Sequence, residues 1–351
     1  MSLIVSRTPF RISFAGGGTD LPSFYRREQG AVLSTTIDKY VYVMVNRRTP
    51  PFGNGIRLSC TPLGSVGGDH GEGDPFLRRI RISYSSTENV QKVDEVEHPI
   101  VREALRLLEI QDPIDISTIA DIPAGTGLGS SSTFAVALLH ALHEFKGERV
   151  APAQLVAEAA HIEIDVLQRP MGKQDHCAAA FGGLNLFTFL PDEDVKVHTL
   201  APGLSVQERL FPYLMLFYTG VCRHSSDILT EQKANTEHRH AELVGMREHA
   251  YQLERLVLDG FSPSAFGRVL HDTWMYKRML ASGITNEFID QWYERARAAG
   301  AWGGKLCGAG GGGFLLLVAE PQARAAIKAQ LAELPELPIQ FEPCGSQILL
   351  R

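Results

Sequence analysis

The sequence lacks most of the features that mark specialised classes of protein. Its five cysteines are scattered, odd in number and free of CxxC pairs, which argues against a disulfide framework and against a cysteine zinc site. No run approaches 18 apolar residues, and the N-terminus has no long apolar stretch of the signal-peptide type. With 34 Lys and Arg against 40 Asp and Glu and no basic stripe, nucleic acid is not an expected partner. The sequence therefore predicts a cytoplasmic protein that binds neither membrane nor nucleic acid.

The length and the hydrophobic pattern predict two α/β domains. At roughly 100–200 residues per domain, 351 residues suffice for two domains, each with its own core. Strand and helix patterns mix along the chain, and a boundary near 191–194 gives domains of residues 1–190 and 191–351. The glycine-rich segment 53–73 is interpreted as a surface insertion. Helical patterns cover 98–109, 133–145, 153–168 and 225–300, and strand patterns cover 32–46, 114–119, 184–190, 195–200, 214–218 and 314–318.

The most informative motif is the segment 123–132, PAGTGLGSSS, which leads from a strand into an apolar helix. Glycines let the backbone approach an anion, and a helix beginning near Ser131 points the positive end of its dipole at the same place. The serines can cap that helix or offer hydroxyls to a metal. Because the Gly-Lys-Ser/Thr ending is absent, this is no Walker A loop. The segment predicts a phosphate-binding loop, with a serine-capped glycine turn as the alternative.

A second glycine-rich segment, 308–313, satisfies the pattern GxGxxG. The dinucleotide-binding motif requires a helix directly after the glycines, where the pyrophosphate binds. Here the apolar strand pattern 314–318 follows, so a dinucleotide-binding role is excluded by context. What remains is either a glycine loop whose backbone lies against a ligand or a plain tight turn.

Glu163 occupies an unusual place in the predicted helix 153–168. With about 100° per residue, its neighbours within about 60° are apolar: Val156, Ala159, Ala160, Val166 and Leu167. An unpaired carboxylate in the middle of an apolar face is costly. Glu163 therefore pairs with a buried Arg or Lys, or it binds a metal, and the nearby phosphate-binding loop favours the metal.

Three further side chains are candidates for chemistry. Asp175, beside Lys173 in a glycine-bounded turn, is a candidate general base or alternatively a helix-capping residue. Arg11, in the first strand, can neutralise charge on a transferring phosphoryl group. Asp20, at the end of the glycine turn that follows this strand, can accept hydrogen bonds from sugar hydroxyls. Taken singly, Arg11 and Asp20 are each better explained as partners in surface ion pairs.

Three segments in order, 8–20 (TPFRISFAGGGTD), 123–132 and 305–313 (KLCGAGGGG), carry a resemblance over nearly the whole chain. The sequence resembles the kinases of the galacto-, homoserine, mevalonate and phosphomevalonate (GHMP) superfamily. Within this superfamily, the motifs AGGGTDLPSFY and MGKQD are most similar to those of the D-glycero-D-manno-heptose 7-phosphate kinases, with fucose-kinase-like domains next.

The resemblance implies a two-domain fold with the active site in the cleft between the domains. It implies that the loop wraps the triphosphate of ATP, and that Ser131 and Glu163 hold Mg²⁺. It implies that Asp175 is the catalytic base and Arg11 the cation beside the reacting oxygen. The residues expected to bind ATP are Pro123, Gly125, Gly127, Leu128, Gly129, Ser130, Ser131 and Ser132. The residues expected to bind the sugar are Gly17, Gly18, Thr19, Asp20, Lys173, Arg223, Gly308, Gly310 and Gly311.

The activity implied by the resemblance is ATP-dependent phosphorylation of the anomeric C1 hydroxyl of D-glycero-D-manno-heptose 7-phosphate. The 1,7-bisphosphate would feed nucleotide-activated heptose into a bacterial surface polysaccharide. Cations are needed for the 7-phosphate, and Arg223, Lys277 and Arg278 are the candidates. Two alternatives stay open: another sugar 1-kinase, acting on fucose, galactose or an unphosphorylated heptose, and a non-catalytic sugar–ATP sensor. The expected partners are ATP and a sugar phosphate, and association into a homo-oligomer is left open.

Overall fold

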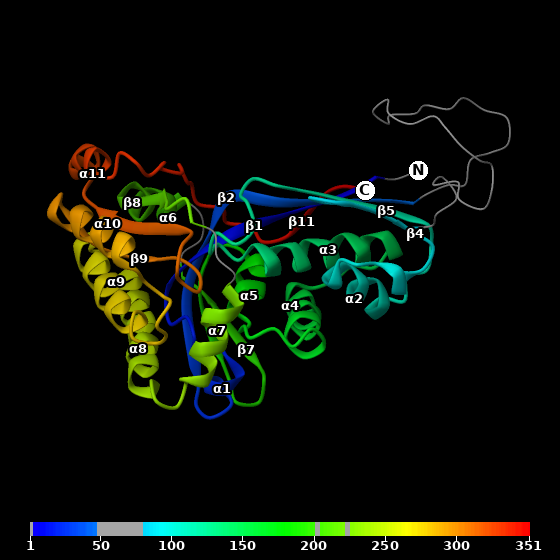
Figure 1. The fold of residues 1–351 in the computed structure, drawn as a ribbon, viewed down its shortest axis with the longest axis horizontal. Coiled ribbons are helices and arrows are strands. Elements are labelled where there is room, and N and C mark those ends of the chain that lie inside the picture. The colour runs from blue at the N-terminus through cyan, green and yellow to red at the C-terminus, as the bar shows by residue number, and fades with distance from the viewer. Residues whose placement is uncertain (1–2, 48–79, 201–203, 222–224) are drawn as a thin grey trace.

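The computed structural model describes residues 3–47, 80–200, 204–221 and 225–351. Within these ranges the chain forms two sheets, each covered by helices (Figure 1). This confirms the predicted mixed α/β fold. The proposed insertion at 53–73 lies outside the described residues.

The larger sheet is built around two long antiparallel strands, β1 (Ile4–Ala15) and β2 (Gly30–Arg47). One end of β2 pairs with β5, the other end with β6, and the strand order is β11-β1-β2-β5-β3-β4 with β6 and β7 joined at β2. Both long strands are buried over most of their length, as expected for the centre of a sheet. The other strands are β3 (Ile80–Ser83), β4 (Thr87–Val90), β5 (Ile114–Ala120), β6 (Leu184–Phe189), β7 (Val195–Thr199) and β11 (Gln347–Leu350).

Helices α3 and α5 pack on one face of the larger sheet, and α2 and α4 pack against these two helices (Figure 1). The central helix is α3 (Ser130–Lys146), which begins directly after the left-handed Gly129 and ends at the left-handed Gly147. Its long buried surface packs on β1, β2 and the neighbouring helices, so the end of the glycine-serine motif is held rigidly. The other three helices are α2 (Pro99–Leu107), α4 (Pro152–Ala160) and α5 (Gln174–Phe181), and the short α1 (Pro22–Tyr25) follows β1.

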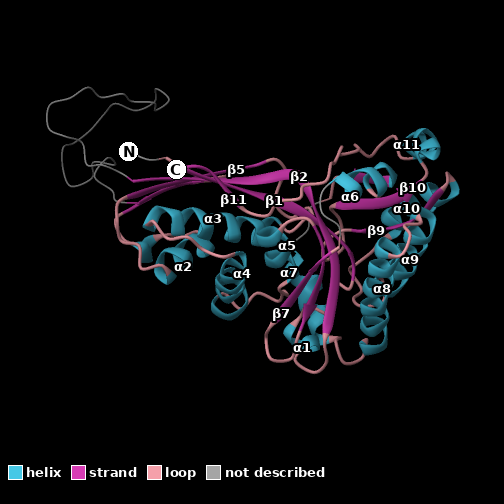
Figure 2. Ribbon diagram, turned by 180° about the vertical axis from the view of Figure 1, so that it is seen from behind, coloured by secondary structure: helices cyan, strands magenta, loops and turns pink. Residues whose placement is uncertain are grey.

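The second sheet has three antiparallel strands, β8 (Leu214–Tyr218), β9 (Ala301–Leu306) and β10 (Phe314–Ala319), with β10 in the middle. Helices α9 and α10 pack on it, and α8 packs on α9 and on β1 and β2 of the larger sheet (Figure 2). One continuous apolar core includes residues of both sheets. The helices of this half are α6 (Leu204–Arg209), α7 (Ser225–Ala234), α8 (His240–Leu258), α9 (Pro263–Lys277), α10 (Glu287–Ala298) and α11 (Arg324–Gln330).

The predicted boundary between residues 190 and 191 stays a prediction. Two strands beyond it belong to the larger sheet: β7 pairs with β6, and β11 pairs with β1. The C-terminal segment thus returns to the first half of the chain. Among the described residues, no helix has the length and apolar character needed to cross a membrane.

Two sequence predictions of local structure are corrected. The helix expected over 153–168 is α4 followed by a π-helical turn, η3 (His161–Val166). The turn expected after Lys173 is the first turn of α5. The segment 301–306, for which no element was predicted, forms β9, whose glycines allow close packing against α9. In contrast, β10 directly follows the glycines 308–313, which confirms that no helix is present to complete a dinucleotide-binding motif.

Candidate active site

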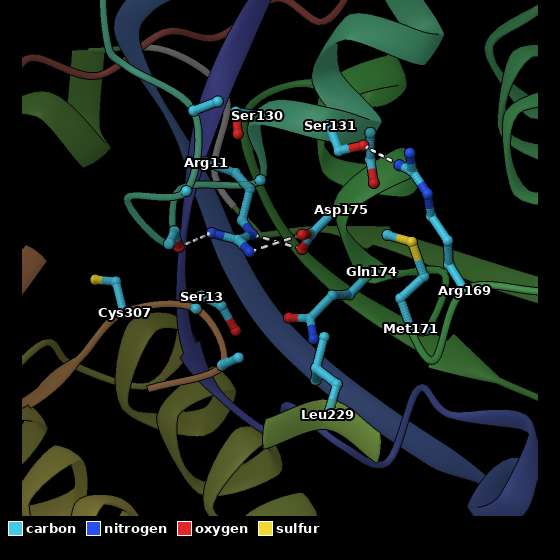
Figure 3. A pocket seen from close by; sticks show the side chains of 18 of the residues that line it. Arg11, Ser13, Ser130, Ser131, Arg169, Met171, Gln174, Asp175, Leu229 and Cys307 are labelled. Carbon is cyan, nitrogen blue, oxygen red and sulfur yellow. Dashed lines mark hydrogen bonds and ion pairs between the residues drawn. The ribbon is translucent and has the colours of Figure 1, made fainter. Parts of the chain in front are cut away.

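A cleft of about 1110 Å³ lies where the two halves of the molecule meet (Figure 3). Its walls come from the glycine-serine motif and α3, from β1 and the turn after it, and from α5. Residues of α7, α8, α9 and the glycine loop 308–313 complete it. The cleft therefore brings together all three segments that carry the family resemblance.

The glycine-serine motif forms a loop whose backbone only glycine accepts easily. Gly125, Gly127 and Gly129 all have φ between 78° and 86°, in the left-handed region. The loop ends at the N-terminus of the 17-residue α3, where backbone N–H groups and the helix dipole favour an anion. Of the predicted ATP-binding residues, Leu128 is buried beneath the loop, and the other seven line the cleft.

Glu163 is fully buried, as its place on the apolar face predicted. Its carboxylate accepts a hydrogen bond from Ser131 Oγ at 2.5 Å and forms an ion pair with Arg169 Nη1 at 2.5 Å. The carboxylate also lies 2.8 Å from His176 Nε2. Burial acts to raise the pKa of Glu163, but the bonds from His176 and Ser131 and the Arg169 charge lower it to about 2. Ser131 and an ionised carboxylate thus stand side by side, with an arginine bridging them.

The buried Arg11 and the partly exposed Asp175 form a bidentate ion pair in the cleft. Arg11 Nε lies 2.6 Å from one carboxylate oxygen of Asp175, and Nη2 lies 2.8 Å from the other (Figure 3). The third donor, Nη1, binds the carbonyl of Gly127 at 2.8 Å, so the pair is fixed against the glycine-serine loop. This arrangement places a carboxylate and a rigid cation next to the expected phosphate site.

Asp20 is also buried and closes the glycine turn after β1. It accepts hydrogen bonds from the backbone N–H of Gly18 at 2.9 Å and from the Gln174 side chain at 2.9 Å. Burial raises the pKa of Asp20. Gly172 is required here, because a Cβ on it would lie 2.1 Å from the Asp20 carboxylate. Gly17, Gly18 and Asp20 line the cleft, whereas Thr19 is buried and bonds the backbone of the turn.

The glycine loop 308–313 packs directly on the glycine-serine loop. A Cβ on Gly308 would lie 2.4 Å from the Cα of Gly127, so two glycines face each other. Gly308 and Gly310 line the cleft, and Gly311 instead donates its N–H to the Ile284 carbonyl at 2.8 Å.

The four predicted cationic residues differ in their placement. Lys173 points away from the cleft into a second cavity, where it pairs with Glu193 at 2.6 Å. Arg278 pairs with Asp290 at 2.7 Å and does not line the cleft, whereas Lys277 does line it. Arg223 lies outside the described residues.

Sequence reasoning missed several residues of this cleft. At the end next to α3, the rings of Tyr84, His98 and Phe134 make contacts with centroids 5.0 and 5.2 Å apart, an environment suited to a flat aromatic ring. Arg169 and Gln174 were also missed, and only the fold shows that they face the site. The one available signal was position, since Arg169 lies two residues before the MGKQD segment and Gln174 lies within it.

Comparison with known families matches both halves of the chain. The model of the GHMP kinases N terminal domain matches residues 99–183, and that of the GHMP kinases C terminal region matches residues 258–336. The D-glycero-alpha-D-manno-heptose 7-phosphate kinase of Campylobacter jejuni is 27% identical, over 92% of this chain and 91% of its own length. The L-fucokinase/L-fucose-1-P guanylyltransferase of Bacteroides fragilis is 26% identical, over 94% of this chain and 36% of that longer protein.

Solved structures share the fold. A D-glycero-D-manno-heptose 1-phosphate kinase from Bacteroides thetaiotaomicron superimposes with a TM-score of 0.75 at 23% identity, covering 98% of both chains. The galactokinase of Lactococcus lactis superimposes with a TM-score of 0.73 at 15% identity, covering 99% of this chain and 95% of the other.

The fold, the two matched domains and the cleft define a kinase that phosphorylates small molecules with ATP. The chain carries both the N-terminal and the C-terminal domain of the GHMP kinases.

Proposed function

We propose that this kinase phosphorylates the anomeric C1 hydroxyl of D-glycero-D-manno-heptose 7-phosphate. The observation that carries the proposal is similarity over more than nine-tenths of both chains to a heptose 7-phosphate kinase. The Arg11–Asp175 pair, which lies between the phosphate loop and the Asp20 turn, supplies a place where a sugar hydroxyl can react. The product is the 1,7-bisphosphate, a precursor of activated heptose for a surface polysaccharide.

In the proposed reaction, Asp175 accepts the proton of the C1 hydroxyl. The hydroxyl oxygen forms a bond to the γ-phosphorus of ATP while the bond from that phosphorus to the bridging oxygen of ADP breaks. Arg11 keeps the carboxylate oriented and stabilises the negative charge that develops on the transferring group. The N-terminus of α3 and the loop glycines bind the phosphates.

Ser131 and Glu163 fit a magnesium site, because the Ser131 hydroxyl lines the cleft and lies 2.5 Å from the ionised carboxylate of the buried Glu163. Within the described ranges, no group of three or more His, Cys, Asp and Glu side chains forms a metal cage. Two protein ligands suffice when phosphates supply the rest. The bound ion would neutralise charge on the phosphates. Arg169 now bridges both ligands, so its guanidinium must leave when the ion binds.

Two other functions are distinguishable from this one. Fucose is the substrate favoured by the similarity to the fucokinase of Bacteroides fragilis. A non-catalytic sugar–ATP sensor is disfavoured, since such a protein has no need of Arg11, Glu163 and Asp175 together.

ADP release with Mg·ATP across a panel of sugars tests the proposal. The panel contains mannose, fucose, galactose, mannoheptose and mannoheptose 7-phosphate, and Asp175→Asn is the inactive control. We expect turnover confined to the heptose phosphate. Faster turnover of an unphosphorylated sugar moves the protein to another sugar kinase, and binding without any turnover supports the sensor.

A further inference from the structure

Two buried lysines face the cleft with no carboxylate to balance them in the described ranges. They are Lys277 of α9, 5% exposed, and Lys305 of β9, 2% exposed. Lys277 Nζ donates to the carbonyls of Leu306 at 2.8 Å and Gly308 at 2.5 Å. Lys305 Nζ donates to two carbonyls of β1, at 2.7 and 3.1 Å. An ammonium has three N–H donors, so each lysine keeps one for a ligand.

The other cations of the cleft are paired. Arg11 binds Asp175 and Arg169 binds Glu163, which leaves Lys277 and Lys305 as neighbouring charges that only carbonyl dipoles stabilise. Burial lowers the pKa of Lys305 to about 8, and burial together with the Lys305 and Arg11 charges lowers that of Lys277 well below its ordinary value. Burying two such groups is costly, and an anion bound in the cleft compensates for that cost.

Ser13 adds a third polar group to the same wall. Its hydroxyl is buried and lines the cleft, where no partner in the described structure binds it (Figure 3). Lys305 bonds the backbone carbonyl of Ser13 itself, so the hydroxyl and the ammonium belong to one cluster. Ser13 pairs with β2 in regular register two residues after Arg11, which puts both side chains on one face, about 7 Å apart.

We infer that Ser13, Lys277 and Lys305 form a subsite for a phosphoryl group that does not react. The inference rests on the proposed function, in which the sugar carries a phosphate at the end remote from the reacting hydroxyl. The spacing indicates that this phosphoryl group belongs to the sugar. Arg11 marks the end of the site where the hydroxyl reacts, and Ser13 lies further along β1 toward the sugar-binding turn. A Cβ added to Gly17 in that turn would lie 3.8 Å from the Ser13 hydroxyl. The terminal phosphate of ATP could occupy the same subsite, and the experiment below distinguishes the sugar phosphate from the nucleotide.

Binding measured by calorimetry on the full chain tests the subsite. The ligands are mannoheptose 7-phosphate, mannose 6-phosphate, both unphosphorylated sugars and AMP-PNP. Ser13→Ala removes a hydroxyl without a partner, so the fold tolerates it, and we expect about fivefold weaker binding of the sugar phosphates. Lys277→Met and Lys305→Met are expected to weaken it at least about tenfold, since charge-assisted bonds are lost. All three variants should bind the free sugars and AMP-PNP as the unchanged protein does.

Arg278→Met is the matched control. Arg278 directly follows Lys277 at the end of α9, and its charge pairs with Asp290 outside the cleft. Weaker binding of AMP-PNP together with unchanged binding of the sugar phosphates would overturn the assignment and would give the subsite to the nucleotide. Equal weakening of every ligand would overturn it in favour of a structural role. If the heptose phosphate does not bind but mannose 6-phosphate binds more tightly than mannose through these residues, the subsite stands and the proposed substrate falls.

Discussion

At the scale of single residues, Asp175 has the most demanding role in the account. It is held by two bonds from Arg11 and lies against the phosphate loop, where a Cβ on Gly129 would be 3.3 Å from its carboxylate. Replacing it with Asn keeps the shape and removes the proton acceptor. We expect kcat to fall by about 10²–10⁴-fold, the usual contribution of a general base. ATP binding, measured by calorimetry, should stay nearly unchanged, and its loss would count against the role.

Arg169 is the residue whose role depends most on whether the metal is bound. Arg169→Met leaves the buried Glu163 with His176 and Ser131 as its partners. We expect the metal-free variant to lose about 1–3 kcal/mol of stability, the cost of removing one partner from a buried polar group. Thermal unfolding should show a smaller difference from the unchanged protein in Mg·ATP, because the ion replaces the guanidinium. An equal difference with and without Mg·ATP would contradict this exchange.

Some of these site residues could be predicted from the sequence, and others could not, for a physical reason. Glu163 was predicted from its own helix, since an acid on an apolar face needs a partner wherever the helix packs. Arg169 and Ser13 gave no such signal, because their importance comes from residues far away in the sequence. Lys173 was expected at the sugar, yet in the fold it points to Glu193 on the other side of α5.

At the scale of elements, the π-helical turn η3 is the feature that periodicity missed. A 3.6-residue pattern continues through 153–168, but the backbone widens at His161 and the N–H of Leu167 bonds the carbonyl of Ile162 at 2.9 Å. π-helical turns occur often at functional sites. Here the turn carries Glu163, which contacts Ser131 on α3 and His176 on α5. The strand β9 was missed because its glycines resemble a loop when packing against α9 is unknown.

The junction of α3 with α4 predicts a pH dependence of stability. His143 is buried between Glu158 at 2.7 Å and Glu148 at 2.8 Å, and the hydrogen bond that its ring donates to Glu158 is the main cause that raises its pKa. A raised pKa means that the folded state favours the charged ring. The charged His143 ring therefore stabilises the folded state fully below the ordinary pKa of 6.5, and this stabilisation is lost as the pH rises through the raised pKa.

Urea unfolding of the unchanged protein and His143→Gln at several pH values measures this contribution. The difference in unfolding free energy should be largest near pH 6 and should shrink toward pH 9. The neighbouring His140, whose pKa burial lowers to about 4, titrates well below this window. A difference that grows with pH would show that the neutral ring is the form the fold prefers.

At the scale of the whole molecule, the cleft exists because distant segments return to one place. β1 and the Asp20 turn come from the start of the chain, and Lys277, Lys305 and the loop 308–313 come from its last quarter. The mixed α/β fold and its main elements were predictable from hydrophobic pattern, but the return of β11 to β1 was not, because strand pairing over such separation leaves no local trace. The family resemblance supplied the arrangement of the three segments.

The carbon atom that receives the transferred phosphate is the sharpest test of the proposed activity. The protein is incubated with Mg·ATP and D-glycero-D-manno-heptose 7-phosphate, and the product is analysed by NMR that correlates phosphorus with protons. The account predicts a second phosphate coupled to H1 of the heptose, beside the original phosphate at C7. A new phosphate on any other carbon, or an unchanged heptose phosphate alongside a free sugar that is phosphorylated, would contradict it.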